Sequence, residues 1–331
     1  MKTLHIIDHY SLGGAQRIVE GILRALPESM LLPLRQKGSP NEQIVVPAEQ
    51  VMLEPGGNWF CQMLRLLKTP HLIRQQDFQI VHCHLPASWL FGLWLYLALP
   101  ARRKLRFIFH EHDSIKLGRW YYPLLVHAAR RAGTLVAVSH FIQQQIAAHG
   151  IPPQDIHLLH NFVDLERFAP GAPPDLARFG LATQQVQPGR VVGFAGRLVA
   201  YKGWQYLIDA ATRLRSRNIR FLIAGEGRDA SKLARQIETL KLAETVFPLG
   251  YVSHMVDFYR LVDILVITSE RESFGLVQLE AQACGVPVIL FENQAALEMH
   301  GAQSTVIVPY GDTDALVDQI IHLLEDQDAR K

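Results

Sequence analysis

The chain has 331 residues, of which 49% are hydrophobic and 19% are charged, with a formal net charge of +2. This length suits two domains of ordinary size, and the small net charge argues against nucleic acid as a partner. The cysteines, Cys61, Cys83 and Cys284, are isolated from one another, so neither a disulfide framework nor a zinc knuckle is expected. These numbers indicate a globular protein of a reducing cytoplasm.

Short apolar runs alternate with helical patterns along the first half of the chain. The first run, residues 4–7, is too short for an export signal and predicts a buried strand. Further strands are expected at 79–84, 105–110 and 134–139, and helices at 17–26, 87–99 and 141–148. The segment 87–99 is the most hydrophobic, but it falls short of the ~20 residues that cross a bilayer. It predicts a buried helix that is apolar all round.

The same alternation restarts after a loop rich in proline and glycine, residues 169–190. Strands are expected at 190–196, 220–225, 245–250, 263–269, 286–291 and 305–309. Strands separated by helices are typical of parallel βαβ units. The predicted fold is therefore α/β, with two Rossmann-like, doubly wound parallel sheets in domains 1–165 and 166–331 and a cleft between them.

Glycine-rich loops follow two of these strands, where ligands bind in doubly wound sheets. Gly13 and Gly14 precede a helix, so the backbone could approach an anion there; a plain tight turn is the alternative. GEGRDA, residues 225–230, opens a helix as a dinucleotide fingerprint does. The acidic residue that would hold a ribose at the tip of the next strand is missing, which disfavours a nicotinamide dehydrogenase.

Two cations occur in FAGRLVAYKGW, residues 194–204. Arg197 leaves the end of a strand, and Lys202 lies at the entry to the next helix. Arginine offers a planar fork of donors and lysine a point charge, so the pair suits a diphosphate and could replace magnesium in neutralising it. An ordinary exposed pair is the alternative.

Two glutamates, Glu272 and Glu280, lie in SERESFGLVQLEAQACG, residues 269–285. A helix is expected from Phe274 onward, with Glu272 at its mouth and Glu280 about 12 Å further along at 1.5 Å per residue. Carboxylate pairs that act on one glycosidic bond are closer than this. The spacing suits two contacts on a long ligand, with the amides of Phe274 and Gly275 facing an anion between them.

The motifs HCH, residues 82–84, and HEHD, residues 110–113, raise the question of a metal site. Adjacent residues of a strand point to opposite faces. His82 and His84 are then the only pair on one face, and no third ligand is evident from the sequence. No metal site is therefore expected.

Nearly the whole chain resembles the retaining glycosyltransferases of the GT-B fold, family 4 of the carbohydrate-enzyme grouping. The motifs in the family's order are GGAQR, VHCHLP, HEHDS, LVAVS, HNFVDLERFAP, GRLVAYKG, AGEGRD and ERESFGLVQLEA. The resemblance implies an acceptor-side domain, 1–165, and a domain that binds the nucleotide sugar, 166–331. It also implies transfer from a UDP- or GDP-sugar to a hydroxyl of a glycan or lipid-linked acceptor, as in cell-envelope polysaccharide or glycolipid biosynthesis, with no metal or other cofactor.

The resemblance also implies roles for single residues. Glu272 would hold hydroxyls of the donor sugar, and Glu280 would bind the ribose. Arg197 and Lys202 would grip the diphosphate. His112 falls where the family places a histidine facing the sugar, with His110 as a competitor. The remaining donor-binding positions are Gly13, Gly14, Gly225, Val252 beside the base, and the amides of Phe274, Gly275 and Leu276.

Two alternatives remain: a GT-B phosphorylase, which needs a pyridoxal lysine, and a sugar-nucleotide-binding pseudoenzyme. A basic cluster, residues 101–106 with Arg130 and Arg131, is either solvated surface or a contact for anionic lipid. We expect a cytoplasmic monomer, with peripheral contact to the inner face of the membrane as the functional interpretation of that cluster.

Overall fold

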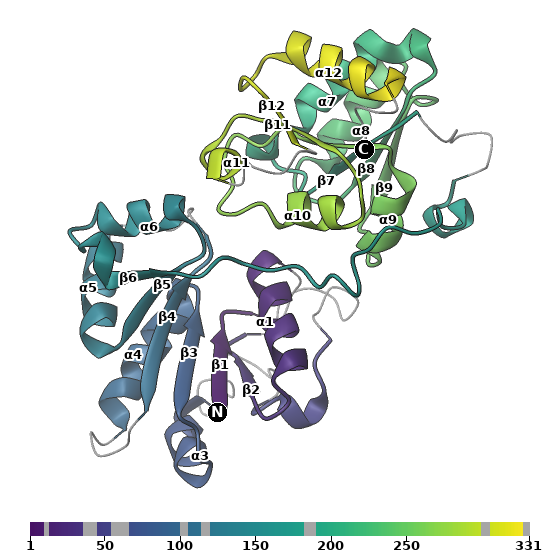
Figure 1. The fold of residues 1–331 in the computed structure, drawn as a ribbon. Coiled ribbons are helices and arrows are strands. Elements are labelled where there is room, and N and C mark those ends of the chain that lie inside the picture. The colour runs from purple at the N-terminus through teal and green to yellow at the C-terminus, as the bar shows by residue number, and fades with distance from the viewer. Residues whose placement is uncertain are drawn as a thin grey trace. The chain divides into compact units, whose positions relative to one another are not determined.

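The computed structural model describes residues 1–9, 13–35, 45–53, 66–99, 105–113, 120–181, 190–298 and 305–326. The chain divides into two compact units, Met1–Asn161 and Phe162–Lys331. Each unit contains a six-stranded sheet in which every described strand pairing is parallel, flanked by helices (Figure 1). The predicted fold class of two Rossmann-like sheets is confirmed.

The N-terminal sheet has the strand order β2-β1-β3-β4-β5-β6. Its strands are β1 (Thr3–Ile7), β2 (Met30–Pro33), β3 (Ile80–His84), β4 (Arg106–Glu111), β5 (Thr134–Ala137) and β6 (Ile156–Leu158). Its helices are α1 (Gly14–Ala25), α3 (Thr69–Gln75), α4 (Pro86–Ala98), α5 (Tyr122–Ala132) and α6 (His140–Ala147). The sequence did not predict β2 and β6, because these edge strands are too short to show a clear apolar run.

Helices cover both faces of this sheet. On one face, Ile7 of β1 packs with Val19 and Leu23 of α1. On the other face, α4 lies so close to β3 and β4 that a Cβ atom on Gly92 would come within 2.3 Å of the Cys83 sulfur. Glycine at this position therefore lets α4 approach the sheet.

The expectation that the helix over 87–99 is buried all round is wrong. Trp89 of α4 is completely buried, but Leu90 and Leu97 are 56% and 82% exposed. The helix packs on the sheet with one side, and these two leucines lie on its exposed side. No helix among the described residues is long and apolar enough to cross a membrane.

The C-terminal sheet has the strand order β12-β11-β10-β7-β8-β9. Its strands are β7 (Val191–Ala195), β8 (Arg220–Ala224), β9 (Val246–Gly250), β10 (Ile264–Ile267), β11 (Val288–Phe291) and β12 (Thr305–Val308). Its helices are α7 (Trp204–Leu214), α8 (Ala230–Thr239), α9 (Met255–Leu261), α10 (Leu276–Ala283), α11 (Gln294–Glu298) and α12 (Thr313–Glu325). All six strands fall where the sequence predicts them.

Two hydrophobic clusters fill the two faces of this second sheet. One joins the sheet to α7, α8 and α12 through residues such as Trp204, Leu233 and Leu316. The other joins it to α9 and α10 through residues such as Phe258 and Ala281. The strand order runs outward in both directions from β7 and β10, and the helices α7 and α10 that follow these two strands lie on opposite faces of the sheet. Such sheets bind ligands at this switch point.

Candidate functional site

The loops that follow β7 and β10 are bound tightly to each other. Gly203 has a φ of +72°, and a Cβ atom there would lie 2.0 Å from the carbonyl oxygen of Thr268. The Thr268 hydroxyl donates to the Gly203 carbonyl at 2.8 Å, and the Glu270 amide donates to the Tyr201 carbonyl at 2.8 Å. Only glycine fits at position 203, since both the left-handed backbone and the close approach exclude a side chain.

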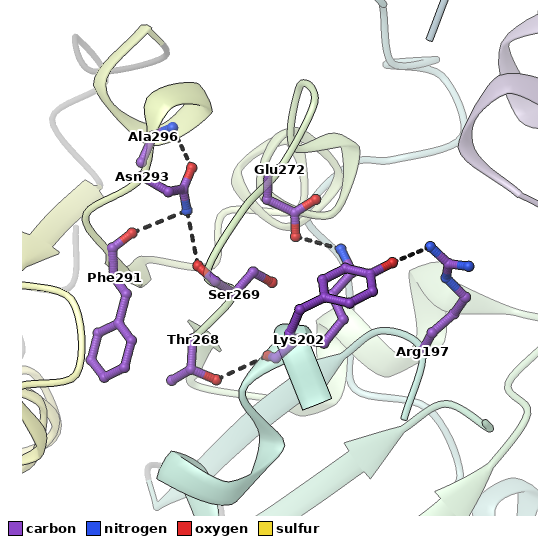
Figure 2. Close-up of polar contacts among 9 residues, drawn as sticks. Arg197, Lys202, Thr268, Ser269, Glu272, Phe291, Asn293 and Ala296 are labelled. Atoms are coloured by element: carbon purple, nitrogen blue, oxygen red, sulfur yellow. Dashed lines mark hydrogen bonds and ion pairs between the residues drawn. The ribbon is translucent and has the colours of Figure 1, made fainter. Parts of the chain in front are cut away.

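This docking brings Lys202 and Glu272 together from positions 70 residues apart (Figure 2). Lys202 ends a short 3-10 helix, Ala200–Lys202, and its Nζ lies 2.5 Å from Oε1 of Glu272. Their side chains are 17% and 20% exposed. The sequence predicted both residues as ligand contacts but did not predict that they form an ion pair.

Tyr201 lies at the centre of a group of cations. Arg197 donates a hydrogen bond to its hydroxyl. The charged groups of Arg197, Lys202 and Arg271 lie 5.8, 5.8 and 5.0 Å from its ring centroid. We call these four residues the Tyr201 cation cluster. Cations near the face of an aromatic ring are held by its quadrupole, so the cluster concentrates positive charge at the carboxyl edge of the sheet.

The sequence analysis missed Tyr201 and Arg271. Tyr201 stands between the two predicted cations in the sequence, which was a usable signal. Arg271 belongs to the loop after β10, and only the docking of the two loops brings it to the ring.

The expectation that the helix carrying Glu280 begins at Phe274 is wrong. The helix α10 begins at Leu276, after Gly275 with a φ of +96°. Glu272 therefore lies in an irregular loop, and the separation of about 12 Å calculated from helical rise does not apply. The first amides of α10 have no earlier residue of the helix that can accept from them.

Glu280 lies inside α10 and is only 5% exposed. Its Oε2 accepts a hydrogen bond of 2.7 Å from the hydroxyl of Tyr259, a fully buried residue of α9. This contact fixes the orientation of the carboxylate. Tyr259 is a third site residue that was not predicted from the sequence, since nothing in its local pattern distinguishes it from a core aromatic.

Gly225 holds the loop after β8 against the loop that carries Arg197. It has a φ of +150°, and a Cβ atom there would lie 1.9 Å from the Gly196 carbonyl oxygen. The Leu198 amide donates to the Glu226 carbonyl at 2.8 Å. The glycines of GEGRDA thus allow the two loops to pack together even without a bound ligand. Val252, near the expected base position, is half-buried just beyond the end of β9.

Asn293 fixes the loop after β10 from its other side (Figure 2). Its side-chain amide donates to the carbonyls of Ser269 and Phe291 at 3.3 and 3.1 Å. Its Oδ1 accepts from the Ala296 amide at 3.0 Å. Asn293 is buried, and these bonds hold the loop in place.

The N-terminal unit carries the other predicted residues. Gly13 is extended and directly precedes α1, which begins at Gly14; residues 10–12 of the expected anion loop lie outside the described residues. His112 follows β4 and is 8% exposed, and its Nε2 lies 3.0 Å from Nδ1 of His84. Burial lowers the pKa of His112 to about 3, so the ring is neutral near pH 7.

Glu111, just before His112, is completely buried. Its carboxylate accepts from the Tyr122 hydroxyl at 2.8 Å and from the amides of His112 and Asp113 at 3.1 and 3.2 Å. Burial raises the pKa of Glu111 to about 8. These bonds fix the backbone that positions His112.

The expectation that His82 and His84 have no third neighbour is wrong. In the register of the sheet, His5 of β1 lies opposite His82, and His110 of β4 lies opposite His84. Together with His112 they form one buried group, which we call the histidine cluster. Burial lowers the pKa of His5 to about 4 and those of His82, His84 and His110 well below the ordinary value. Alternation within one strand could not reveal this cluster, because it depends on pairing between strands.

Comparison with known proteins agrees with this architecture. The family described as glycosyl transferases group 1 matches residues 183–331, and the family described as Glycosyltransferase Family 4 matches residues 12–167. The HepE protein of Anabaena, solved with UDP and glucose, covers 99% of this chain and 91% of its own, with a TM-score of 0.81 and 21% identity. The apo lipopolysaccharide outer core galactosyltransferase WaaB covers 98% and 90%, with a TM-score of 0.68 and 18% identity.

Two relatives are similar in sequence. The D-inositol 3-phosphate glycosyltransferase of Mycolicibacterium smegmatis is 38% identical over 157 residues, which are 44% of this chain and 34% of the relative. The N-acetyl-alpha-D-glucosaminyl L-malate synthase of Bacillus anthracis is 24% identical over 273 residues, which are 80% of this chain and 70% of the relative. The match to the first relative thus spans about a third of its length.

Two Rossmann-like parallel sheets, with charged loops at the carboxyl edge of the second, define a protein of the GT-B class. With both family matches, which together span most of the chain, the protein belongs to the family 4 glycosyltransferases.

Proposed function

We propose that the protein is a retaining glycosyltransferase that moves a sugar from a nucleotide diphosphate to a hydroxyl of a glycan or lipid-linked acceptor. Synthesis of a cell-envelope polysaccharide or glycolipid is the process that such an acceptor suggests. The observation that carries the proposal is the half-buried ion pair of Lys202 and Glu272 beside Arg197, at the carboxyl edge of the C-terminal sheet.

Leaving-group stabilisation is the chemical role of the two cations. When the bond between the anomeric carbon and the diphosphate breaks, negative charge grows on the departing phosphate. Arg197 and Lys202 are held in place by Tyr201 and Glu272 before substrate arrives, and preorganised charges of this kind stabilise a transition state most. The amide of Leu276 at the start of α10 and the preceding amides of Phe274 and Gly275 add a dipole for the same anion. No metal ion is needed at the diphosphate in this scheme.

The sugar and the nucleoside occupy the two sides of this anion site. Glu272 accepts hydrogen bonds from hydroxyls of the donor sugar, and Glu280, oriented by Tyr259, accepts from the ribose. The base lies near Val252, beyond the end of β9, and Gly225 lets the backbone approach the nucleotide. By the resemblance to the family, backbone amides at Gly13 and Gly14 would also contact the phosphates.

Retention follows from attack on the same face as the leaving group. The acceptor oxygen forms the new bond to the anomeric carbon, the bond to the diphosphate oxygen breaks, and the acceptor proton passes to the leaving phosphate. The charged residues of the donor site are already engaged in fixed contacts, and none is an evident nucleophile for a double displacement. His112, a neutral ring next to this chemistry in the family's arrangement, contacts the sugar.

Uridine is the favoured base. The HepE structures contain UDP with glucose, UDP alone, or UDP-glucose. A thermal-shift screen of UDP- and GDP-sugars tests this choice, because a ligand that binds only the folded state raises the melting temperature. NMR of the product made with the stabilising donor then gives the anomeric configuration. An inverted product would contradict the proposed mechanism.

Two other functions give different results in the same preparation. A phosphorylase would show the visible absorbance of pyridoxal phosphate. A sugar-nucleotide-binding pseudoenzyme would bind the donor but transfer no sugar to any acceptor and would not hydrolyse it. The intact ion pair at the donor site favours the enzyme.

We also propose a cytoplasmic monomer that contacts an anionic membrane through α4 and the start of α5. Leu90 and Leu97 of α4 are exposed, as are Trp120 and Leu124 at 86% and 71%. Residues 101–104 of the basic cluster lie outside the described residues, and Arg130 is paired with Asp155. Flotation with vesicles of anionic lipid at low salt tests the proposal; equal binding of wild type and Leu97→Glu would contradict it.

A further inference from the structure

The histidine cluster brings five imidazole rings to one face of the N-terminal sheet. His5 lies on β1, His82 and His84 lie on β3, and His110 and His112 lie at the end of β4. Their exposed fractions are 2%, 7%, 0%, 2% and 8% in that order. Cys83 and Phe109 of the same strands face α4 instead. The positions that would ordinarily hold Val or Ile in a buried parallel sheet thus hold metal-binding side chains.

The ring nitrogens already lie at separations that suit a shared ion. Nδ1 of His5 is 3.1 Å from Nε2 of His84, and Nδ1 of His84 is 3.0 Å from Nε2 of His112. Zinc binds histidine nitrogen at about 2.0–2.1 Å, so two ligand nitrogens of a tetrahedral site lie about 3.4 Å apart. The two pairs engage different nitrogens of His84, so one ion binds within one pair or the other, and either pair needs only small ring movements to hold it.

Two groups of three rings meet this requirement. In the group His5, His82 and His84, and in the group His84, His110 and His112, one ligand atom from each ring lies within 4.8 Å of the others. His84 belongs to both groups, so it is the ligand that either arrangement needs. A single ion bound by His84 is thus the simplest occupancy of the cluster.

Contacts between the rings do not satisfy every ring nitrogen of the cluster. Nε2 of His5, Nε2 of His110 and Nδ1 of His112 are buried and have no hydrogen-bond partner among the described residues. A buried polar atom without a partner is destabilising. Nε2 of His82 lies 3.2 Å from Nδ1 of His110, and such contacts between rings fix the orientation of ligand histidines in metal sites.

We propose that the histidine cluster binds one divalent transition-metal ion with neutral imidazole nitrogens as its protein ligands, His84 being the common ligand. Nitrogen ligands of this kind suit zinc, copper, nickel and iron(II). Such an ion would join β1, β3 and β4 near their carboxyl ends. This metal site lies in the N-terminal unit, whereas Arg197 and Lys202, which would neutralise the diphosphate, lie in the C-terminal unit. The inference therefore stands whether or not the protein transfers a sugar.

The test uses untagged, chelator-treated full-length protein titrated with Zn²⁺ and, separately, with Co²⁺. We expect about one ion per chain, a zinc dissociation constant below about 1 µM, a rise in melting temperature with zinc, and the strong visible absorption of tetrahedral Co²⁺. Failure of the wild-type protein to bind either ion stoichiometrically overturns the proposal, and this result needs no variant.

Matched substitutions locate the ion. His84→Asn should weaken zinc binding at least about 100-fold, whereas His140→Asn, at an exposed position at the start of α6, should leave it unchanged. Either His5→Asn or His110→Asn should weaken it 10-fold or more and so identify which group holds the ion. Circular dichroism and a cooperative unfolding transition verify that each variant folds. Wild-type affinity in folded His84→Asn, or in both His5→Asn and His110→Asn, overturns the assignment.

Discussion

Replacing Glu272 with glutamine should tighten the binding of UDP and slow the transfer of sugar. The carboxylate lies 2.5 Å from Nζ of Lys202 and therefore offsets the charge that the diphosphate would meet. Glutamine has the same shape but no charge. UDP carries no sugar, so it loses no contact to Glu272 and gains from the released lysine charge.

The magnitude follows from the geometry of the pair. If Lys202 holds a phosphate oxygen on its other side, the carboxylate and the phosphate are about 6 Å apart, and at an effective dielectric constant of about 40 they repel by about 1.4 kcal/mol. This dielectric constant is intermediate because both side chains are about one-fifth exposed. The expected change is thus about tenfold tighter binding of UDP.

Glu272→Gln should slow sugar transfer even though it tightens the binding of UDP. Hydrogen bonds to a charged acceptor contribute about 1.5–3 kcal/mol, so kcat/KM for the nucleotide sugar should fall about 10- to 100-fold. Calorimetry at low and at high salt measures the first effect, and initial rates measure the second.

Glu270→Gln is the matched control, since it removes an equal charge from an exposed position of the same loop. Its affinity for UDP should change less than about twofold, because water screens an exposed charge. The reasoning is refuted if Glu272→Gln binds UDP no more tightly than wild type at low salt, or if the control shows an equal gain.

Four further changes test other parts of the structure. Lys202→Ala should lower kcat about 100-fold and raise KM much less, because its contact strengthens as charge develops; steady-state rates that show only a KM effect would count against this role. Glu280→Ala should weaken UDP binding by about 1.5–3 kcal/mol and Tyr259→Phe by about 1 kcal/mol, and unchanged calorimetric affinity in Glu280→Ala would remove the ribose contact. Gly203→Ala should destabilise the protein by more than Gly180→Ala in urea unfolding. Both glycines have a positive φ, which costs about 1–2 kcal/mol for alanine, but only the Cβ at position 203 would clash, since a Cβ at position 180 meets nothing within 4 Å. Equal losses of stability would contradict the close approach of Gly203 to Thr268. In chelator-treated protein, the free energy of unfolding should fall as the pH drops below about 6.5, because the buried histidines have lowered pKa values in the folded state and take up protons mainly in the unfolded state. Each histidine contributes up to about 1.4 kcal/mol per pH unit to this loss. Urea midpoints that do not change between pH 7 and 5.5 would contradict the prediction.

Local patterns predicted much of the fold. Alternating apolar runs and helical segments located most strands, because a strand buried on both faces is mostly hydrophobic. They failed for β2 and β6, which are short edge strands, and for the outer side of α4. The apolar residues of α4 are partly exposed, so composition alone overstated its burial.

The candidate residues of the donor site were also readable from the sequence. Arg197, Lys202 and Glu272 each follow a strand, and the ends of parallel strands share one edge of a sheet. Their pairing was not readable, since it depends on the close contact of Gly203 with Thr268. Tyr259 and Asn293 carry no local signal, because a buried tyrosine and a loop asparagine occur for many structural reasons.

The histidine cluster marks the limit of what the sequence determines. The sequence by itself determined that the chain forms two series of parallel strands, that charged loops follow the second series, and that single histidines stand in buried strands. Only the tertiary structure decided which of these residues meet. Strand order and register bring β1, β3 and β4 side by side with His5 opposite His82 and His84 opposite His110. Alternation within a strand fixes the face of each side chain, but its neighbours across the sheet are set by the packing of the whole unit.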